Sequence, residues 1–405
     1  MEPGGGHARV GLGGGPGSGA SRRTRVDRVR IRGYRSLLDV DVPLHGLNVL
    51  IGPNGAGKTS LIEVFLLLAD AMNERLASAL SDLGGIAQVL TRDVGDSVLL
   101  ELEAPSKAFP HPLRYELEIA PLGVGYEIKR ERLSQEQTRG PERPFVFVDN
   151  VPGRPRFFWE GALVAPTWEF DEKETALAQM SRTLRTYPET EELRRGLASV
   201  AHFATLDVSK RAVVRLPQEL RPVSAPGANG QDLYAFLYTL RADHPDRYER
   251  LQDILRVAFP GFRMAEFPLV ASGQATMAWH DVFSKPLYPP QLSEGTLRFI
   301  WLAALLLSPN PPGITLIDEP EVSLHPELLR LLAGLLQEAS MRTQLIVATH
   351  ADRLIRWLKP DEVLIADKSE GASTLTRADT LDLKQWLEEY TLDELWLMGE
   401  IGGRP

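Results

Sequence analysis

The chain of 405 residues contains no cysteine. This absence excludes disulfide bonds, cysteine-ligated zinc and catalysis by a thiol. The chain also lacks an apolar run of the about 18 residues that a membrane span requires. Its longest apolar run, residues 299–307, has the length of a buried helix. No secretory signal opens the chain, because residues 1–20 are rich in glycine rather than basic and then apolar. We therefore expect a cytoplasmic protein with no membrane partner.

An excess of positive charge is also missing. The formal net charge is −9, so bulk electrostatics does not draw the chain onto nucleic acid. Residues 21–35 are a local exception, because they hold seven arginines. Two interpretations are open: this segment contacts DNA, or arginines such as Arg28 and Arg30 lie on the solvated face of a strand whose other face carries Val29 and Ile31.

Hydrophobic periodicity divides the chain into segments of two kinds. Alternation of apolar and polar residues over 97–133 and 144–159 predicts antiparallel strands, and helical spacing follows in two stretches up to about residue 255. Short apolar strands separated by helical stretches predict a parallel α/β core; they lie at residues 47–51, 313–318, 344–350 and 362–367.

These patterns predict one α/β core that is split by a long insertion. Residues 1–22 are expected to form a disordered, glycine-rich tail. Residues 23–96 would form the first part of the core, residues 97–280 an inserted β and helical region, and residues 281–405 the second part of the core.

Residues 52–59, GPNGAGKT, match the pattern of a phosphate-binding loop, with an apolar strand before them and helical spacing after them. Glycines let successive backbone N–H groups point at phosphate oxygens. Lys58 would reach the β- and γ-phosphates, and the Thr59 hydroxyl would bind Mg²⁺. The predicted nucleotide contacts are Gly52, Pro53, Asn54, Gly55, Ala56, Gly57, Lys58, Thr59 and Ser60.

A second acidic motif, GITLIDEPEVSLHP, occupies residues 313–326. Asp318 follows an apolar strand and is suited to bind Mg²⁺ or its water shell, while Glu319 can accept a proton from an attacking water. Glu321 is either functional or the charge at the start of a helix. His325 and Pro326 are typical of a cap and a first helical position.

Ser293 and Gly295 stand immediately before an apolar helix in the stretch QLSEGTLRFIW, residues 291–301. Backbone N–H groups and a hydroxyl at a helix N-terminus can form an anion site. A serine at this position is equally typical of a simple N-cap. The residues alone leave both interpretations open.

The order of these motifs resembles that of ABC-type ATPase heads, in which a P-loop is followed by a Ser-x-Gly helix start, by LIDEPE and by VATH. More closely, residues 28–63 and 292–329 resemble the AAA/RecF-like ATPases of the SMC, RecF and OLD (overcoming lysogenization defect) group. The closing LDELWLMGEIGGRP resembles the tail of stand-alone ATPases of that group. The resemblance implies a P-loop NTPase with a mixed or parallel core sheet, an antiparallel β subdomain and an inserted helical subdomain.

The resemblance also assigns roles to further residues. Ser293 and Gly295 would belong to a signature motif that contacts the γ-phosphate bound by a second subunit, although LSEGT departs from the LSGGQ of transporter ATPases. His350 matches the switch histidine that touches the γ-phosphate. Gln88 is a candidate for the metal-sensing glutamine, and Arg35 for a residue that approaches the nucleotide.

These roles predict an ATP- and Mg²⁺-dependent ATPase that forms an ATP-sandwiched homodimer and couples hydrolysis to DNA handling or to a partner, in repair or phage defence. Only 55 residues follow His350, so a Toprim-like nuclease would be a separate protein. A nucleotide-gated scaffold with negligible turnover is the alternative. A transporter subunit is less favoured, because 235 positions separate Lys58 from Ser293.

Overall fold

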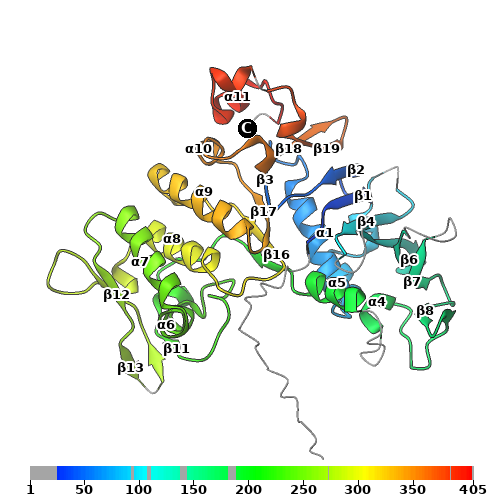
Figure 1. Cartoon of the computed structure of the whole chain (residues 1–405), viewed down its shortest axis with the longest axis horizontal. Coiled ribbons are helices and arrows are strands. Elements are labelled where there is room, and N and C mark those ends of the chain that lie inside the picture. The colour runs from blue at the N-terminus through cyan, green and yellow to red at the C-terminus, as the bar shows by residue number, and fades with distance from the viewer. Residues whose placement is uncertain are drawn as a thin grey trace, which may run out of the picture.

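The computed structural model describes residues 25–92, 95–106, 111–136, 144–180, 188–271, 273–383 and 385–403 (Figure 1). The predicted disordered tail at residues 1–22 lies outside these ranges. Two large sheets organise the chain, one parallel in its main part and one antiparallel. Within the described residues, no helix is both long enough and apolar enough to span a bilayer.

The core sheet has the strand order β10-β16-β17-β3-β18-β19. All neighbours are parallel except β19, which runs antiparallel to β18. This confirms the predicted α/β core with a mixed sheet. The strands are β3 (Leu47–Ile51), β10 (Ala201–Phe203), β16 (Ile314–Asp318), β17 (Gln344–Ala348), β18 (Val363–Ser369) and β19 (Ala372–Arg377).

Helices cover both faces of the core sheet, which explains why its central strands are mostly apolar. Leu47, Val49 and Ile51 of β3 share a hydrophobic cluster with helices α6 to α9, while Leu50 joins the cluster of α1. Every residue of β3 and β17 is buried. The main helices are α1 (Lys58–Ala71), α6 (Leu233–Asp243), α7 (Pro245–Ala258), α8 (Glu294–Leu306) and α9 (Pro326–Ser340).

The second sheet is antiparallel, with the order β2-β1-β4-β5-β6-β7-β8-β9. Buried and partly exposed residues alternate along it, as the sequence predicted. Because β1 pairs with β4, strands on both sides of the predicted division at residue 97 belong to one sheet; the domain division stays a prediction. The strands are β1 (Arg28–Tyr34), β2 (Leu37–Pro43), β4 (Val98–Ala104), β5 (Leu113–Leu122), β6 (Gly125–Gln135), β7 (Phe145–Asn150), β8 (Arg156–Trp159) and β9 (Ala162–Val164).

Shorter elements connect these layers. Two three-residue strands, β12 (Met264–Glu266) and β15 (Ala278–His280), pair next to the helices of the inserted region. The others are α2 (Leu76–Asp82), α3 (Ile86–Val89), α4 (Ala176–Gln179), α5 (Pro188–Ala198), β11 (Gln218–Glu219), β13 (Leu269–Ala271), β14 (Gln274–Ala275), α10 (Asp352–Ile355), α11 (Leu392–Met398) and the 3-10 turns at 213–215, 289–291, 360–362, 378–380 and 386–388.

The arginine-rich segment at the start of the chain is paired with carboxylates. Each described arginine of residues 25–35 has an acidic partner within 3.8 Å. Such pairs on a sheet surface neutralise charge and add little stability. The structure therefore favours the solvated-face interpretation over a free basic patch; the pairs are Arg25–Asp27, Arg28–Asp41, Arg30–Asp39, Arg32–Asp39 and Arg35–Glu63.

Candidate nucleotide-binding site

The predicted phosphate-binding loop joins the end of β3 to the start of α1. Gly52, Gly55 and Gly57 all have positive φ, of 142°, 76° and 97°. A β-carbon on Gly52 would lie 2.0 Å from the carbonyl oxygen of Ala366, so only glycine fits there. The strand, loop and helix therefore have the geometry in which backbone N–H groups and a helix N-terminus surround an anion.

Lys58 lies at the centre of this loop and is buried. Its ammonium group donates to the carbonyl oxygen of Gly52 at 2.6 Å and to that of Pro53 at 3.1 Å. Burial lowers the pKa of Lys58, and the nearby carboxylates of Asp318 and Glu319 oppose that shift. A desolvated cation held by the carbonyl oxygens at the start of the loop is placed where it can reach the phosphates of a nucleotide.

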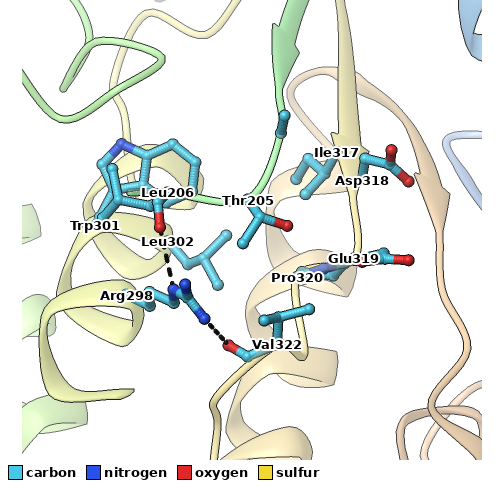
Figure 2. A pocket seen from close by; sticks show the side chains of 11 residues that line it. Thr205, Leu206, Arg298, Trp301, Leu302, Ile317, Asp318, Glu319, Pro320 and Val322 are labelled. Carbon is cyan, nitrogen blue, oxygen red and sulfur yellow. Dashed lines mark hydrogen bonds between the residues drawn. The ribbon is translucent and has the colours of Figure 1, made fainter. Parts of the chain in front are cut away.

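Asp318 ends β16 and is half-buried beside the loop. Burial raises the pKa of its carboxyl, and the neighbouring charge of Glu319 adds to this, while His202, His350 and Lys58 oppose it. In Figure 2 the carboxylates of Asp318 and Glu319 point to the same side of the strand end. Burial disfavours the charged form of this carboxylate, and a bound cation such as Mg²⁺ would stabilise it.

Glu319 has a left-handed backbone, with φ of 47°. This conformation costs a residue with a side chain about 1–3 kcal/mol and is concentrated at functional sites. It is held here because the Glu319 N–H donates to the carbonyl oxygen of Ala348, at the end of β17, at 2.8 Å. The carboxylate predicted to accept a proton is therefore placed by the two central strands together.

His350 follows β17 and faces the same acidic loop. Its Nε2 lies 3.9 Å from the Oε1 of Glu319. Its backbone N–H donates to the Oε1 of Glu321 at 2.8 Å, and the Oε2 of Glu321 is buried without a hydrogen-bond partner among the described residues. Glu321 thus connects two loops of the site. It is not a helix-start charge, because α9 begins five residues later and has Glu327 in its first turn.

His325 and Pro326 start α9 as predicted. The Nδ1 of His325 accepts a hydrogen bond from the N–H of Glu327 at 3.4 Å, and Pro326 is the first helical residue. These two residues are explained by helix capping.

Ser293 is the N-cap of α8. Its hydroxyl accepts from the N–H of Thr296 at 3.1 Å, so the capping interpretation is confirmed. The anion contact stays a prediction. Gly295 lies so close to the loop after β16 that a β-carbon would be 2.5 Å from the carbonyl oxygen of Ser323. The start of α8 is therefore packed directly on the loop that begins with Asp318 and Glu319.

Arg298, which the sequence did not single out, strengthens this contact. Its guanidinium donates to the carbonyl oxygen of Val322 at 3.1 Å and to the hydroxyl of Ser323 at 2.6 Å. It also donates to the carbonyl oxygen of Leu206 at 3.2 Å (Figure 2). Arg298 thus ties α8, the acidic loop and the segment after β10 together.

His202 and Thr205 were also missed. Both belong to the region predicted as an insertion, but β10 pairs with β16 and brings them beside Asp318. The Nε2 of His202 is buried and has no hydrogen-bond partner among the described residues. Burial lowers the pKa of His202, while the charge of Asp318 opposes this. Thr205 lines a small pocket with Asp318 and Glu319 (Figure 2). A three-residue strand gives no periodic signal in the sequence.

Two predicted residues lie elsewhere. Gln88 is exposed on α3. Arg35 lies in the β1–β2 turn with φ of 49°, and its guanidinium pairs with Glu63 of α1 at 3.0 Å. In the part of the chain that the structure describes, no hydrogen bond or ion pair joins either side chain to the P-loop or to Asp318. Their roles at the metal and the nucleotide stay predictions.

The chemistry of the donor set suits Mg²⁺ more than a metal held by protein alone. The described residues contain no group of three His, Cys, Asp or Glu side chains that could hold a metal. Mg²⁺ in phosphate-transfer sites takes one or two protein ligands, with phosphates and waters completing its shell. Thr59 and Asp318 stay the predicted protein ligands of such a set.

Comparison with known proteins agrees with this geometry. A family model described as "AAA domain, putative AbiEii toxin, Type IV TA system" matches residues 47–356. An OLD nuclease of Thermus scotoductus is 43% identical over 46 residues, which cover 11% of this chain and 9% of that protein. The DNA replication and repair protein RecF of Proteus mirabilis is 42% identical over 55 residues, which cover 13% of this chain and 15% of RecF. The chain thus matches only a small part of each relative.

A solved structure extends the likeness over most of the chain. It is an SMC head bound to the C-terminal winged-helix domain of ScpA, which aligns with a TM-score of 0.55. The alignment is 14% identical in sequence and covers 89% of this chain and 99% of the SMC head. At this level of identity the likeness concerns the fold.

Proposed function

The chain belongs to the family described as "AAA domain, putative AbiEii toxin, Type IV TA system", and from this membership we propose that it hydrolyses ATP at the carboxyl ends of β3, β16 and β17. It is an ATPase of the SMC, RecF and OLD type. One observation carries the proposal: Lys58, at the start of α1, comes together with Asp318 and Glu319, at the end of β16, although these segments lie far apart in the sequence.

Each residue at these strand ends has a task in the proposed reaction. The loop N–H groups and Lys58 bind the β- and γ-phosphates. Thr59 and Asp318 hold Mg²⁺, which supplies charge neutralisation. Glu319 accepts a proton from the attacking water. His350, whose Nε2 lies 3.9 Å from the Oε1 of Glu319, would contact the γ-phosphate. Glu321 keeps the loop of His350 next to the acidic loop.

The proposal includes a dimer in which α8 of one copy contacts the γ-phosphate bound by the other. Ser293 and Glu294 are exposed at the start of this 13-residue helix. The N-terminus of such a helix carries partial positive charge, which suits contact with a phosphate. An exposed helix start on a nucleotide-binding head supports a contact between two copies.

The dimer is tested with Glu319→Gln, which should bind ATP and stall water activation. We expect its molar mass, measured by light scattering, to double when ATP and Mg²⁺ are added. Ser293→Arg in the same background should abolish the doubling. Ser293→Asp should do the same, although aspartate keeps the N-cap of α8, so loss of the dimer would not reflect a lost cap. An unchanged mass in Glu319→Gln with bound ATP would exclude the sandwich.

Hydrolysis is tested separately from dimerisation. The presence of Lys58, Asp318 and Glu319 favours an enzyme that hydrolyses ATP over a scaffold that only binds nucleotide. We expect steady-state phosphate release from the unchanged chain and its loss in Glu319→Gln, while ATP binding persists. Equal phosphate release from both proteins would remove Glu319 from the reaction.

The wider proposal is that the ATP-dependent clasp controls DNA handling or a separate partner protein. The names of two relatives, an OLD nuclease and a DNA replication and repair protein, support a role at DNA. We propose that any nuclease is a separate, Toprim-like protein, so the chain alone should not cut DNA. Mg²⁺-dependent cleavage of plasmid DNA by the purified chain, retained in Lys58→Ala, would overturn this part.

A further inference from the structure

The segment from α11 to Gly403 packs against the start of the phosphate-binding loop. α11 lies beside α10 near the end of the core sheet (Figure 1). It is a short helix with a capping box between Thr391 and Glu394, and it ends at left-handed Gly399. Trp396 is completely buried in the hydrophobic cluster that also contains Val49 and Ile51 of β3. The segment is therefore anchored in the same core as the strand that leads into the P-loop.

Beyond α11 the chain makes a turn through two glycines, Gly402 and Gly403, with φ of 77° and 59°. Gly403 is buried, and its carbonyl oxygen accepts a hydrogen bond from the indole N–H of Trp396. Its N–H points to the Oδ2 of Asp367 at 3.4 Å. Trp396 therefore fixes the position of the Gly403 backbone.

Gly403 in turn lies against Gly52, the first residue of the P-loop. A β-carbon on Gly403 would be 3.5 Å from the Cα of Gly52 and only 2.8 Å from the Cγ2 of Ile365. Gly52 is also in close contact with the carbonyl oxygen of Ala366. Its own carbonyl oxygen accepts the hydrogen bond from Lys58. Gly52 is thus enclosed between the middle of β18 and the Gly403 turn.

We infer that residues 392–403 form a strap that sets the first turn of the P-loop, with Trp396 and Gly403 as positioning residues for the nucleotide phosphates. The strap acts through Gly52, which lies between Gly403 and the ammonium group of Lys58. It contributes binding energy by holding the loop in the conformation that the phosphates need. The inference rests on the proposed ATP binding and adds the segment that prepares the loop for it.

The test compares Trp396→Phe, Gly403→Ala and the control Gly402→Ala with the unchanged chain. Phenylalanine keeps an aromatic ring in the core, removes the donor to Gly403 and leaves part of the volume of the buried indole unfilled. Gly402→Ala carries the same left-handed strain as Gly403→Ala, but its β-carbon meets nothing closer than the Oδ2 of Asp367 at 3.4 Å. Thermal unfolding without nucleotide, calorimetric titration with Mg²⁺-ATP and steady-state hydrolysis are measured for all four proteins.

We expect Trp396→Phe to bind ATP about fivefold more weakly, the scale of one lost hydrogen bond. Gly403→Ala should also bind ATP more weakly, because its β-carbon would lie 2.8 Å from the Cγ2 of Ile365 and displace the turn. KM should rise and kcat should stay, because Glu319 and Asp318 lie at another strand. Amide hydrogen exchange in the P-loop without nucleotide should speed up in these two variants and remain unchanged in Gly402→Ala. A merely structural role would change thermal stability without this local effect.

The outcomes separate the strap from the proposed function. If the unchanged chain binds ATP and both strap variants bind it equally well, the strap is excluded and the ATPase proposal stands. An equal loss of affinity in Gly402→Ala would also exclude it, since strain alone would then explain the effect. If the unchanged chain binds no ATP, the proposed function fails and the strap fails with it.

Discussion

Replacing Gly295 by alanine tests whether the start of α8 is pressed against the acidic loop as closely as the structure shows. A β-carbon at this position would lie 2.5 Å from the carbonyl oxygen of Ser323, whereas ordinary contact begins at about 3.4 Å. Either α8 or the loop would have to move by roughly 0.9 Å. The obstacle is backbone, which cannot rotate away as a side chain can.

The expected change in unfolding free energy is obtained by comparison with a glycine in another helix. Gly334 lies exposed within α9, and a β-carbon there would meet nothing within 4 Å. Gly334→Ala should therefore stabilise the chain by about 0.5–1 kcal/mol through helix propensity alone. Gly295 also has a helical backbone, so comparison of the two variants cancels the propensity gain. The remaining difference is the overpacking cost, about 1–3 kcal/mol.

The assay is urea denaturation of both variants without nucleotide, followed by light scattering with ATP in the Glu319→Gln background. We expect Gly295→Ala to be less stable than Gly334→Ala by that difference and to lose ATP-dependent dimerisation while it still binds ATP. Gly334→Ala should dimerise normally. If Gly295→Ala gains as much stability as Gly334→Ala and still dimerises, the close packing of α8 on the acidic loop is refuted.

Three further predictions concern polar groups that are buried or partly buried. Burial raises the pKa of Glu131 above its ordinary value of 4.5. The stability that Glu131 contributes is therefore full below that value and is lost as pH rises through the raised pKa. Urea denaturation across this range should show that Glu131→Gln lacks this pH dependence, and parallel curves of unfolding free energy against pH for the two proteins would contradict the prediction. Arg298→Met should lower the unfolding free energy by about 1–3 kcal/mol and prevent dimerisation. Thermal unfolding tests the loss of stability and light scattering tests the loss of the dimer; an unchanged result in either measurement would contradict that part of the prediction. His202→Phe removes a buried Nε2 without a partner among the described residues, so urea denaturation should show stability unchanged or raised by about 1 kcal/mol; a marked loss would reveal a partner for that nitrogen.

The P-loop and the acidic motif could be predicted because local sequence determines them. The run at residues 47–51 is buried throughout, and the glycines after it adopt the positive φ angles that only glycine tolerates at Gly52. Asp318 likewise ends a strand whose other four residues are buried, so its place at the carboxyl end of the strand could be predicted from this short segment. Where one short segment contains its own strand, turn and helix signals, its structure does not depend on distant partners.

The other parts of the site and fold could not be predicted from the sequence, because they depend on pairing between distant segments. His202 reaches Asp318 only because the three residues of β10 pair with β16 from a region that the pattern assigned to an insertion. The union of β1 with β4 was hidden for the same reason: alternation predicts a strand but not its neighbour. Glu321 could be misread as a helix-start charge because its partner, the backbone N–H of His350, lies in the loop after β17, far along the chain.

The acidic loop after β16 is held from two sides, and this arrangement links dimer contact to hydrolysis within one copy. On the side of β17, the N–H of Glu319 bonds to Ala348, and Glu321 bonds to His350. On the side of α8, Arg298 bonds to the carbonyl oxygen of Val322, within three residues of Glu319. A force that shifts the start of α8 must therefore move the residues that place the Glu319 carboxylate, whose left-handed backbone has little freedom to absorb the change. If the proposed dimer forms, contact of α8 with the nucleotide of the partner copy also sets the position of Glu319, the proton acceptor, in the copy that makes the contact.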